Sequence, residues 1–368
     1  MILQNIDILN FKNIASSSLE FSSGVNCLLG MNGMGKSNLL EAIHFISMAR
    51  PMTQVPDSAL IRHGEDLMLV KGTFHTEAGG DDIISCGLSK GKGKTLKRNG
   101  KEYRKISEHI GRFPIVTVTP SDSLIITGPA EDRRKLMDMV ISQANAEYLA
   151  LLIKYSHLLE SRNRMLRAGV SDPLLYESVE NGIIESASAI HKTRQEWVAA
   201  IAPKVEQTYA RLAGGKEQTD LSYRSQLDEM TMDQLLATRR EKDAVLGYTS
   251  AGVHRDDLEV RLGGYSLRRL GSQGQVKTFT VALRLAIFDF LKDEKGITPL
   301  LLLDDIFDKL DSERVESIMH EVSSSDTFGQ IFITDTNRKH LNDIIAGLSG
   351  PYSLMNVSDG VFSPLNSN

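Results

Sequence analysis

Cysteine is scarce in this sequence, and segments long and apolar enough to cross a membrane are missing. The chain has 368 residues and two cysteines, Cys27 and Cys86, which lie in apolar contexts with no metal-ligand spacing. We therefore expect two buried thiols and no redox chemistry. The longest apolar runs, such as 300–303, are too short to span a bilayer. Residues 1–11 alternate apolar and polar side chains, which indicates a strand rather than a signal peptide and predicts a cytoplasmic protein.

An excess of positive charge is also lacking, because the formal net charge at pH 7 is −5. A nucleic-acid partner would therefore need a local basic patch. Basic residues do gather between positions 90 and 105 around Asn99-Gly100, a type I′ turn signal that predicts a basic β-hairpin. Lys97, Arg98 and Lys101 are the candidate DNA contacts in it. The alternative is a solvated hairpin whose lysines protect an exposed edge.

The middle third of the chain differs in texture from the two ends, where short strand-like runs dominate. Apolar residues recur at helical spacing from Glu131 to Ala168 and from Asp172 to Leu212, and Asp172-Pro173 is a typical helix start. The pattern predicts an α/β fold. We expect residues 1–120 and 247–368 to form one discontinuous domain and residues 121–246 to form an inserted, mostly α-helical arm.

The most specific motif, G-x-x-x-x-G-K-S, follows a buried strand that ends at residue 29. It consists of Gly30, Met31, Asn32, Gly33, Met34, Gly35, Lys36 and Ser37. Its glycines let several backbone N–H groups converge on a triphosphate, while Lys36 would neutralise the β- and γ-phosphates and Ser37 would ligate Mg²⁺. A glycine-rich turn without a ligand explains Lys36 poorly, because a cation opposes the dipole at a helix start. The motif predicts a site for ATP and Mg²⁺.

Two adjacent acids, Asp304 and Asp305, end a second buried strand. The apolar run 300–303 is typical of a central parallel strand, and ligands gather at the carboxyl ends of such strands. Neighbouring carboxylates need a compensating cation there, which Mg²⁺ bound to ATP would supply. We assign Asp304 to the metal, directly or through water. We assign Asp305 to polarising the attacking water, so that Asp305 and Lys36 are the catalytic candidates.

A further motif, Ser272-Gln273-Gly274-Gln275, precedes a helix with an apolar face. Ser272 and Gln275 fit a capping box, which would explain both residues without a ligand. The order of motifs argues for more, because this capped helix is followed by the acid-bearing strand and then by Asp308-Lys309-Leu310-Asp311. That order is the plan of ABC-type ATPases.

Motifs spread over nearly the whole chain are shared with one protein family. They are Asn10 to Asn13, the phosphate loop, Arg133-Arg134, Tyr155 with Arg162-Asn163, Gly252 to Leu258, Ser272 to Gln275, Leu302 to Asp305, and Leu310-Asp311. Together they resemble the RecF family of bacterial DNA repair proteins, which is related to the structural-maintenance-of-chromosomes (SMC) ATPases.

This resemblance implies an ABC/SMC-type ATPase head and a head-to-tail ATP sandwich. Ser272 and Gly274 of one subunit, with Gln273 between them, would reach the γ-phosphate held by Lys36 of the other. ATP would then close a homodimer on gapped or junction DNA, and slow, DNA-stimulated hydrolysis would release it. RecO and RecR are the implied partners, and the implied role is RecA loading in recombinational repair. The family positions make four arm residues further DNA candidates: Arg133, Arg134, Arg162 and Arg164.

Other protein classes fit these motifs less well. A transporter-type ATPase subunit is the nearest rival, but its signature would read Leu-Ser-Gly-Gly. A GTPase would need a guanine-recognition motif, which Asn337 to His340 only imitates. A small-molecule kinase would need no signature helix. A structural DNA clamp that binds ATP without hydrolysing it stays open, and Asp305→Asn would separate it from an ATPase.

Overall fold

The computed structural model describes residues 1–53, 55–76, 79–215, 217–307, 315–318, 320–321 and 328–365. The chain divides into two compact units. The first unit comprises Met1–Asp122 and Ile287–Asn368, and the second comprises Ser123–Ala286.

Two six-stranded sheets form the frame of the first unit. The antiparallel sheet has the order β2 (Ile14–Glu20), β1 (Ile2–Phe11), β4 (Leu67–Thr76), β5 (Gly80–Ser89), β6 (Gly93–Arg98) and β7 (Lys101–Glu102). The second sheet has the order β15 (Val361–Pro364), β14 (Tyr352–Ser358), β3 (Val25–Leu29), β13 (Ile331–Asp335), β12 (Leu300–Asp304) and β8 (Ile115–Val118). All pairs in the second sheet are parallel except β14 with β15.

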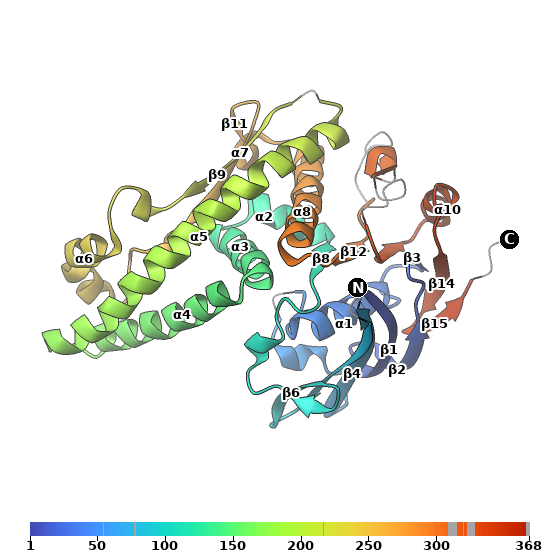
Figure 1. Cartoon of the computed structure of the whole chain (residues 1–368), viewed down its shortest axis with the longest axis horizontal. Helices are drawn as coiled ribbons and strands as arrows, with labels where there is room; N and C mark the ends of the chain where they lie inside the picture. The colour runs from blue at the N-terminus through green and yellow to red at the C-terminus, as the bar shows by residue number, and fades with distance from the viewer. Residues whose placement is uncertain are drawn as a thin grey trace. The chain divides into compact units, whose positions relative to one another are not determined.

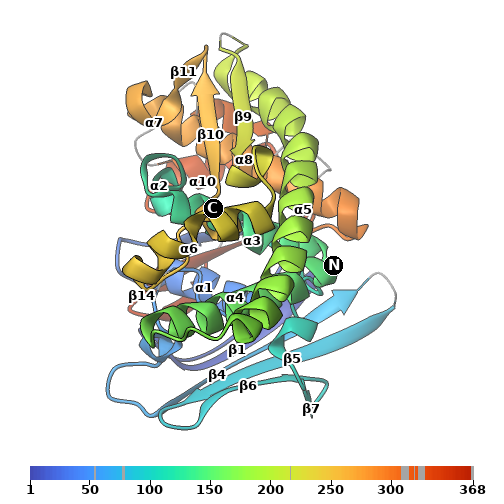
Figure 2. The same ribbon diagram turned by 90° about the vertical axis from the view of Figure 1, so that its left-hand side faces the viewer.

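Helix α1 (Lys36–Met48) lies between these sheets and forms the centre of the core (Figure 2). It contacts β1, β4 and β5 of the antiparallel sheet and β8, β12 and β13 of the parallel one. Its apolar stripe, Leu39, Leu40, Ile43 and Ile46, is completely buried. Because its apolar residues meet a sheet on both sides, the helix holds its first turn, and with it the phosphate loop, in a fixed place.

The parallel pairing gathers the predicted motifs at one edge of the sheet. Strand β13 lies between β3 and β12, with Asp335 opposite Leu29 and Asp304 opposite Thr334. Since parallel strands end on the same side, the phosphate loop after β3 and the acids after β12 come together. Helix α10 (Arg338–Ala346) follows β13 and packs against β3 and β13.

The second unit combines long helices with a small antiparallel sheet (Figures 1 and 2). Its helices are α2 (Ser123–Thr127), α3 (Ala130–Ala144), α4 (Ala146–Arg167), α5 (Pro173–Ala213), α6 (Met232–Leu246) and α7 (Leu267–Leu270), and α8 (Gln273–Lys295) begins in this unit. The sheet has the order β11 (Tyr265–Ser266), β10 (Asp257–Leu262) and β9 (Thr219–Arg224). Single 3-10 turns span Gln226–Asp228 and Val253–Arg255 in this unit, and Asp57–Leu60, Ile106–Glu108 and Pro120–Asp122 in the first unit.

Two features differ from the sequence expectation. The first predicted arm helix is interrupted at Asn145, whose side chain accepts hydrogen bonds from the backbone N–H groups of Glu147 and Tyr148 and so caps α4. In addition, residues 247–286 lie in the second unit, although we expected the ATPase head to resume at 247. The reason is that β10 pairs along its whole length with β9, which precedes that boundary.

No helix in the described ranges is long and apolar enough to cross a membrane.

Candidate nucleotide-binding site

The phosphate loop connects β3 to α1 and is shaped by close backbone contacts. Gly33 and Gly35 have positive φ values of 82° and 114°, which glycine adopts without strain. A Cβ at Gly30 would lie 2.4 Å from the carbonyl oxygen of Val357, and one at Gly35 would lie 2.9 Å from Asn13 Oδ1. Glycine is therefore required at 30 and 35 by neighbouring segments as well as by the loop itself.

Lys36 lies inside the loop with only 3% of its surface exposed. Its ammonium donates to the carbonyl oxygens of Gly30, at 2.7 Å, and Met31, at 3.2 Å. The start of α1 has no side-chain cap and no acid in its first turn. Its free N–H groups and the lysine thus present positive charge at one place, which suits a bound phosphate.

Ser37 and Asp304 come together as the sequence predicts for a magnesium site. Asp304 Oδ1 accepts hydrogen bonds from Ser37 Oγ and from Thr334 Oγ1, each at 2.8 Å. Burial raises the pKa of Asp304, and the two hydroxyl donors oppose that rise. A divalent cation bound here would favour the charged carboxylate in the same way.

The oxygen atoms of Ser37 and Asp304 suit Mg²⁺ better than they suit a metal ion whose ligands all come from protein side chains. The described residues contain no group of three or more His, Cys, Asp or Glu side chains placed to hold a metal ion. Mg²⁺ commonly uses one or two protein oxygens and completes its coordination with phosphates and water. Ser37 and Asp304 would hold the ion, which would then neutralise phosphate charge.

Asp305 adopts a positive φ of 43°, an unusual conformation for a residue other than glycine. Its backbone N–H donates to Thr334 Oγ1 at 3.0 Å, so one hydroxyl connects the two acids. Asp305 lines a pocket of about 380 Å³ together with Asn32 of the phosphate loop. The water-polarising candidate and the phosphate loop therefore open onto the same space.

The pocket is also lined by Asp335, Asn337 and His340, which were not predicted as site residues. His340 Nδ1 lies 2.8 Å from Asp335 Oδ2, and Asn337 accepts a hydrogen bond from the backbone N–H of Lys339 and caps α10. In the sequence, Asn337 to His340 only imitate a guanine-recognition motif. Their position after β13, a neighbour of β12, is the signal that could have identified them.

The signature residues Ser272, Gln273 and Gly274 belong to the second unit, whereas the phosphate loop belongs to the first. The capping box is present, because Ser272 Oγ accepts from the Gln275 N–H at 3.2 Å and Gln275 Oε1 accepts from the Ser272 N–H at 2.8 Å. Ser272 and Gln273 are exposed at the start of α8. The segment Asp308 to Asp311 lies outside the described residues.

The predicted basic hairpin is formed by β6 and β7, with Arg98 opposite Lys101. Asn99 and Gly100 have φ values of 51° and 79°, as a type I′ turn requires. Part of its charge is neutralised, because Arg98 makes a bidentate pair with Asp82 at 2.8 Å. Within the described ranges no acid pairs with Lys97 or Lys101, so these two remain candidate DNA contacts.

The arm arginines require a correction, because two of them are structural. Arg133 is 3% exposed, and its guanidinium contacts both carboxylate oxygens of Asp257, at 2.5 and 3.1 Å. Arg162 is completely buried and pairs with acids of α5 and α6. Both guanidinium groups are occupied by these ion pairs inside the second unit, which argues against their contacting DNA. Arg134 is half-buried and donates to the carbonyl oxygen of Asp256 at 2.6 Å, while Arg164 is exposed, so these two remain candidates.

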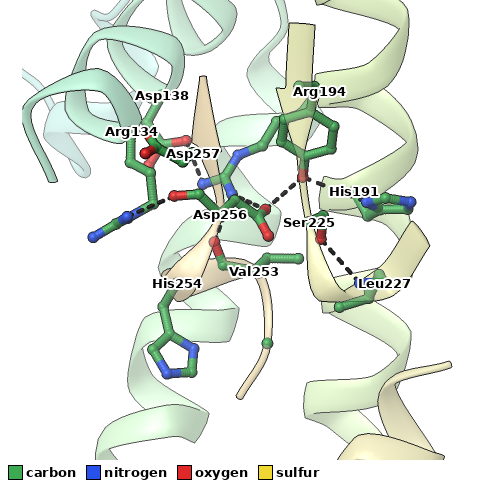
Figure 3. A network of polar contacts seen from close by, with 12 residues as sticks. Arg134, Asp138, His191, Arg194, Ser225, Leu227, Val253, His254, Asp256 and Asp257 are labelled. Atoms are coloured by element: carbon green, nitrogen blue, oxygen red, sulfur yellow. Dashed lines mark hydrogen bonds and ion pairs between the residues drawn. The ribbon is translucent and has the colours of Figure 1, made fainter. Parts of the chain in front are cut away.

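The shared motif Gly252 to Leu258 contributes to a buried polar network in the second unit (Figure 3). Arg194 of α5 is at its centre and donates to Asp138 Oδ1 at 2.8 Å, to Asp256 Oδ2 at 2.6 Å and to the Val253 carbonyl at 2.7 Å. The network ties α3 and α5 to the start of β10. This motif therefore supports the fold of the arm.

The comparisons with known proteins agree with this geometry. The family model described as the RecF/RecN/SMC N terminal domain matches residues 2–357. The DNA replication and repair protein RecF of Parabacteroides distasonis is 45% identical over 99% of this chain and 100% of its own length. RecF of Bacteroides thetaiotaomicron is 41% identical over 99% of both chains.

Solved structures show the same fold. The recombination mediator protein RecF with ATP, of the RecFOR pathway, has a TM-score of 0.89 and 28% identity over 99% of this chain and 98% of that one. An SMC head bound to a winged-helix domain of ScpA has a TM-score of 0.59 at 17% identity over 99% of this chain and 97% of that one, which supports the fold alone. The resemblance drawn from the sequence is confirmed, and the chain belongs to the RecF family of DNA replication and repair proteins, with a P-loop ATPase fold like that of SMC heads.

Proposed function

We propose that this chain is an ATP-dependent DNA-binding protein of recombinational repair, in which ATP closes a homodimer on gapped or junction DNA and slow hydrolysis releases it. The observation that carries the proposal is the connection from Ser37 through Asp304 and Thr334 to Asp305. These hydrogen bonds join the residue types that hold MgATP to the one that would polarise water. The similarity to a RecF solved with ATP supports the choice of nucleotide.

The proposed dimer rests on the family resemblance, which implies that the signature of one subunit meets the phosphate loop of another; in this chain the two motifs belong to different units. Ser272 is exposed, and its hydroxyl oxygen already accepts a hydrogen bond from Gln275, so the hydroxyl proton can be donated to a phosphate. We expect Ser272 to Gly274 of one subunit to complete the site formed by Lys36 and Asp305 of the other. Hydrolysis would then require both subunits.

Family membership supports DNA as the partner, and the name of the RecFOR pathway in the similar structure motivates RecO and RecR as further partners. In this role the protein would act in the cytoplasm and help to load RecA. Lys97 and Lys101 of the hairpin, together with Arg134 and Arg164, are its candidate phosphate contacts. A transporter-type subunit, the nearest rival from the sequence, is not favoured by any feature of the site.

The test measures DNA binding and assembly together. Duplex, single-stranded and gapped DNA are titrated with and without MgATP, and sedimentation is followed under the same conditions. We expect MgATP to produce a dimer and to strengthen binding to gapped DNA. Lys36→Met should remove both effects by weakening ATP binding, and Ser272→Arg should remove them by blocking the second subunit. Ser188→Arg, which adds the same charge at an exposed position of α5, is the control. A wild-type monomer under all conditions would sink the dimer, and absence of DNA binding would sink the function.

A further inference from the structure

The second unit contains a pocket of about 550 Å³ whose lining is rich in arginine. It is lined by residues of β9, β10, β11 and α7, together with Ile126 of α2 and Arg133 of α3. Its arginines are Arg133, Arg224, Arg261, Arg268 and Arg269, and its acids are Asp257 and Glu259. The arginines outnumber the acids, so the pocket carries an excess of positive charge although the chain as a whole is negative.

Strand alternation explains why charged side chains line one face of this small sheet. Leu258, Val260 and Leu262 of β10 are buried, so Asp257, Glu259 and Arg261 lie on the opposite face. Strand pairing adds Arg224 of β9 opposite Asp257 and Ser266 of β11 opposite Arg261. The polar face is thus built from segments more than thirty residues apart in sequence.

The acids of the pocket neutralise only part of this charge. Asp257 is taken up by the bidentate pair with Arg133. Glu259 is shared, because Arg224 Nε donates to its Oε2 at 2.9 Å and Arg261 Nε donates to its Oε1 at 2.8 Å. One carboxylate therefore faces two guanidinium groups, which leaves a local excess of one positive charge.

Arg268 and Arg269 of α7 supply the rest of the excess. Both are exposed, and within the described ranges no carboxylate or carbonyl pairs with either guanidinium. Tyr265 of β11 lines the same pocket and is 68% exposed. Exposed arginines beside an exposed aromatic ring form a surface that suits a phosphate with an attached sugar or base.

We propose that this pocket binds the backbone phosphates of DNA, with Arg268 and Arg269 as the direct contacts. Arg224 and Arg261 would add positive electrostatic potential, and Tyr265 would offer a surface on which a base can stack. The inference rests on the proposed function and gives it a site in the arm, where Arg133 and Arg162 cannot serve. The planar guanidinium fork matches a phosphodiester geometrically. A chain of net charge −5 also needs such a local patch to hold a polyanion.

A second copy of the chain is the alternative occupant of this pocket, because α7 directly precedes the signature residues Ser272 to Gly274. The Gly271 N–H donates to the carbonyl oxygen of Leu267 at 3.0 Å, and a Cβ at Gly271 would lie 2.5 Å from that oxygen. The pocket thus adjoins the surface expected to meet the other subunit. The experiment must therefore follow DNA binding and dimerisation separately.

The test compares two double variants of the full chain that lose the same charge. Arg268→Gln/Arg269→Gln removes the proposed contacts, and Lys192→Gln/Lys242→Gln removes two exposed lysines from α5 and α6 that do not line the pocket. Affinity for fluorescent gapped and duplex DNA is measured over a range of salt concentrations with and without MgATP. We expect the arginine variant to bind about tenfold or more weakly, with the slope of log K against log salt reduced by about two.

The control variant should bind within about twofold of the wild type, and Arg268→Lys/Arg269→Lys should keep the salt slope because it keeps both charges. An unchanged affinity and slope in the arginine variant, or an equal loss in the control, overturns the site. So does an arginine variant that binds DNA normally but no longer sediments as a dimer with MgATP, because the surface would then belong to the second copy. Failure of the wild type to bind DNA would overturn the proposed function as well, which distinguishes the two failures.

Discussion

At the scale of single residues, burial raises the pKa values of Asp304 and of the two cysteines, with different consequences. Burial raises the pKa of Asp304, but Thr334 and Ser37 donate hydrogen bonds that favour its charged form. Cys27 and Cys86 have no such donors among the causes of their shifts, and burial raises both thiol pKa values to about 12. The expected buried thiols are confirmed, and they stay protonated at neutral pH.

Two histidines, His109, which is buried, and His254, which is half-buried, should make the protein lose stability in mild acid. Burial lowers the pKa of His109 and of His254 to about 4. His109 Nε2 donates to the Ile46 carbonyl at 2.7 Å, and His254 Nε2 donates to the Thr249 carbonyl at 3.0 Å. The unfolded chain binds these protons near pH 6.5, whereas the folded chain does so only near pH 4. Stability is therefore full above about pH 6.5 and falls as the pH drops toward 4, by roughly 3 kcal/mol for each histidine.

Denaturant unfolding at pH 7.5, 6 and 5 checks this dependence. His109→Gln should show a shallower loss of unfolding free energy with falling pH, because its unfolded state no longer takes up that proton. His63→Gln, at an exposed position of the same unit, is the matched control. The assignment to His109 would be wrong if both variants followed the wild-type curve.

At the scale of secondary-structure elements, Arg162 holds three helices of the second unit together. It lies on α4 and donates to Glu180 Oε1 of α5 at 2.9 Å and to Asp243 Oδ2 of α6 at 2.7 Å. Both acids are buried. Removing the guanidinium would leave Asp243 buried without its cation, while Glu180 would keep its pair with Arg240. An uncompensated buried carboxylate is more costly than the loss of one hydrogen bond.

Arg162→Met should therefore lower the free energy of unfolding by about 3–5 kcal/mol. Arg164→Met makes the same change two residues along α4 at an exposed position and should cost well under about 1 kcal/mol. Denaturant unfolding of both variants provides the measurement. Equal stability of the two would contradict the structural role given to Arg162.

The elements themselves were largely predictable where the signal is local. The helix starting at Pro173 and capped by Asp172 and the hairpin at Asn99-Gly100 both form as expected. The break at Asn145 was missed because helical periodicity continues across it. The second domain boundary was misplaced because strand pairing between β9 and β10 leaves no mark at residue 247.

At the scale of the whole molecule, the catalytic candidates Lys36 and Asp305 both belong to the first unit, and the proposed dimer would complete their site with Ser272 to Gly274 from the second unit of another subunit. ATP hydrolysis should then rise more than linearly with protein concentration, because only dimers contain a complete site. Asp305→Asn should reduce turnover by about 100-fold or more by removing the group that polarises water. Asp343→Asn, an exposed position on α10, is the control for the same chemical change.

Steady-state phosphate release at several protein concentrations measures both effects. Turnover by Asp305→Asn at the wild-type rate would show that Asp305 does not act in hydrolysis. If the wild type itself releases no phosphate above the rate of Asp305→Asn, the chain is the alternative considered from the sequence, a clamp that holds ATP without hydrolysing it.

The sequence by itself determined the phosphate loop and the paired acids, because a strand, a glycine-rich loop and a helix start are encoded in neighbouring residues. The family followed from the same motifs. Only the tertiary structure decided which arginines are available to a ligand, because ion pairing depends on acids that lie far away in the chain. Arg133 pairs with Asp257 and Arg162 pairs with Asp243. Arg268 and Arg269 are exposed instead. Charge can be read along a sequence, but its availability to a ligand depends on pairings that only folding makes.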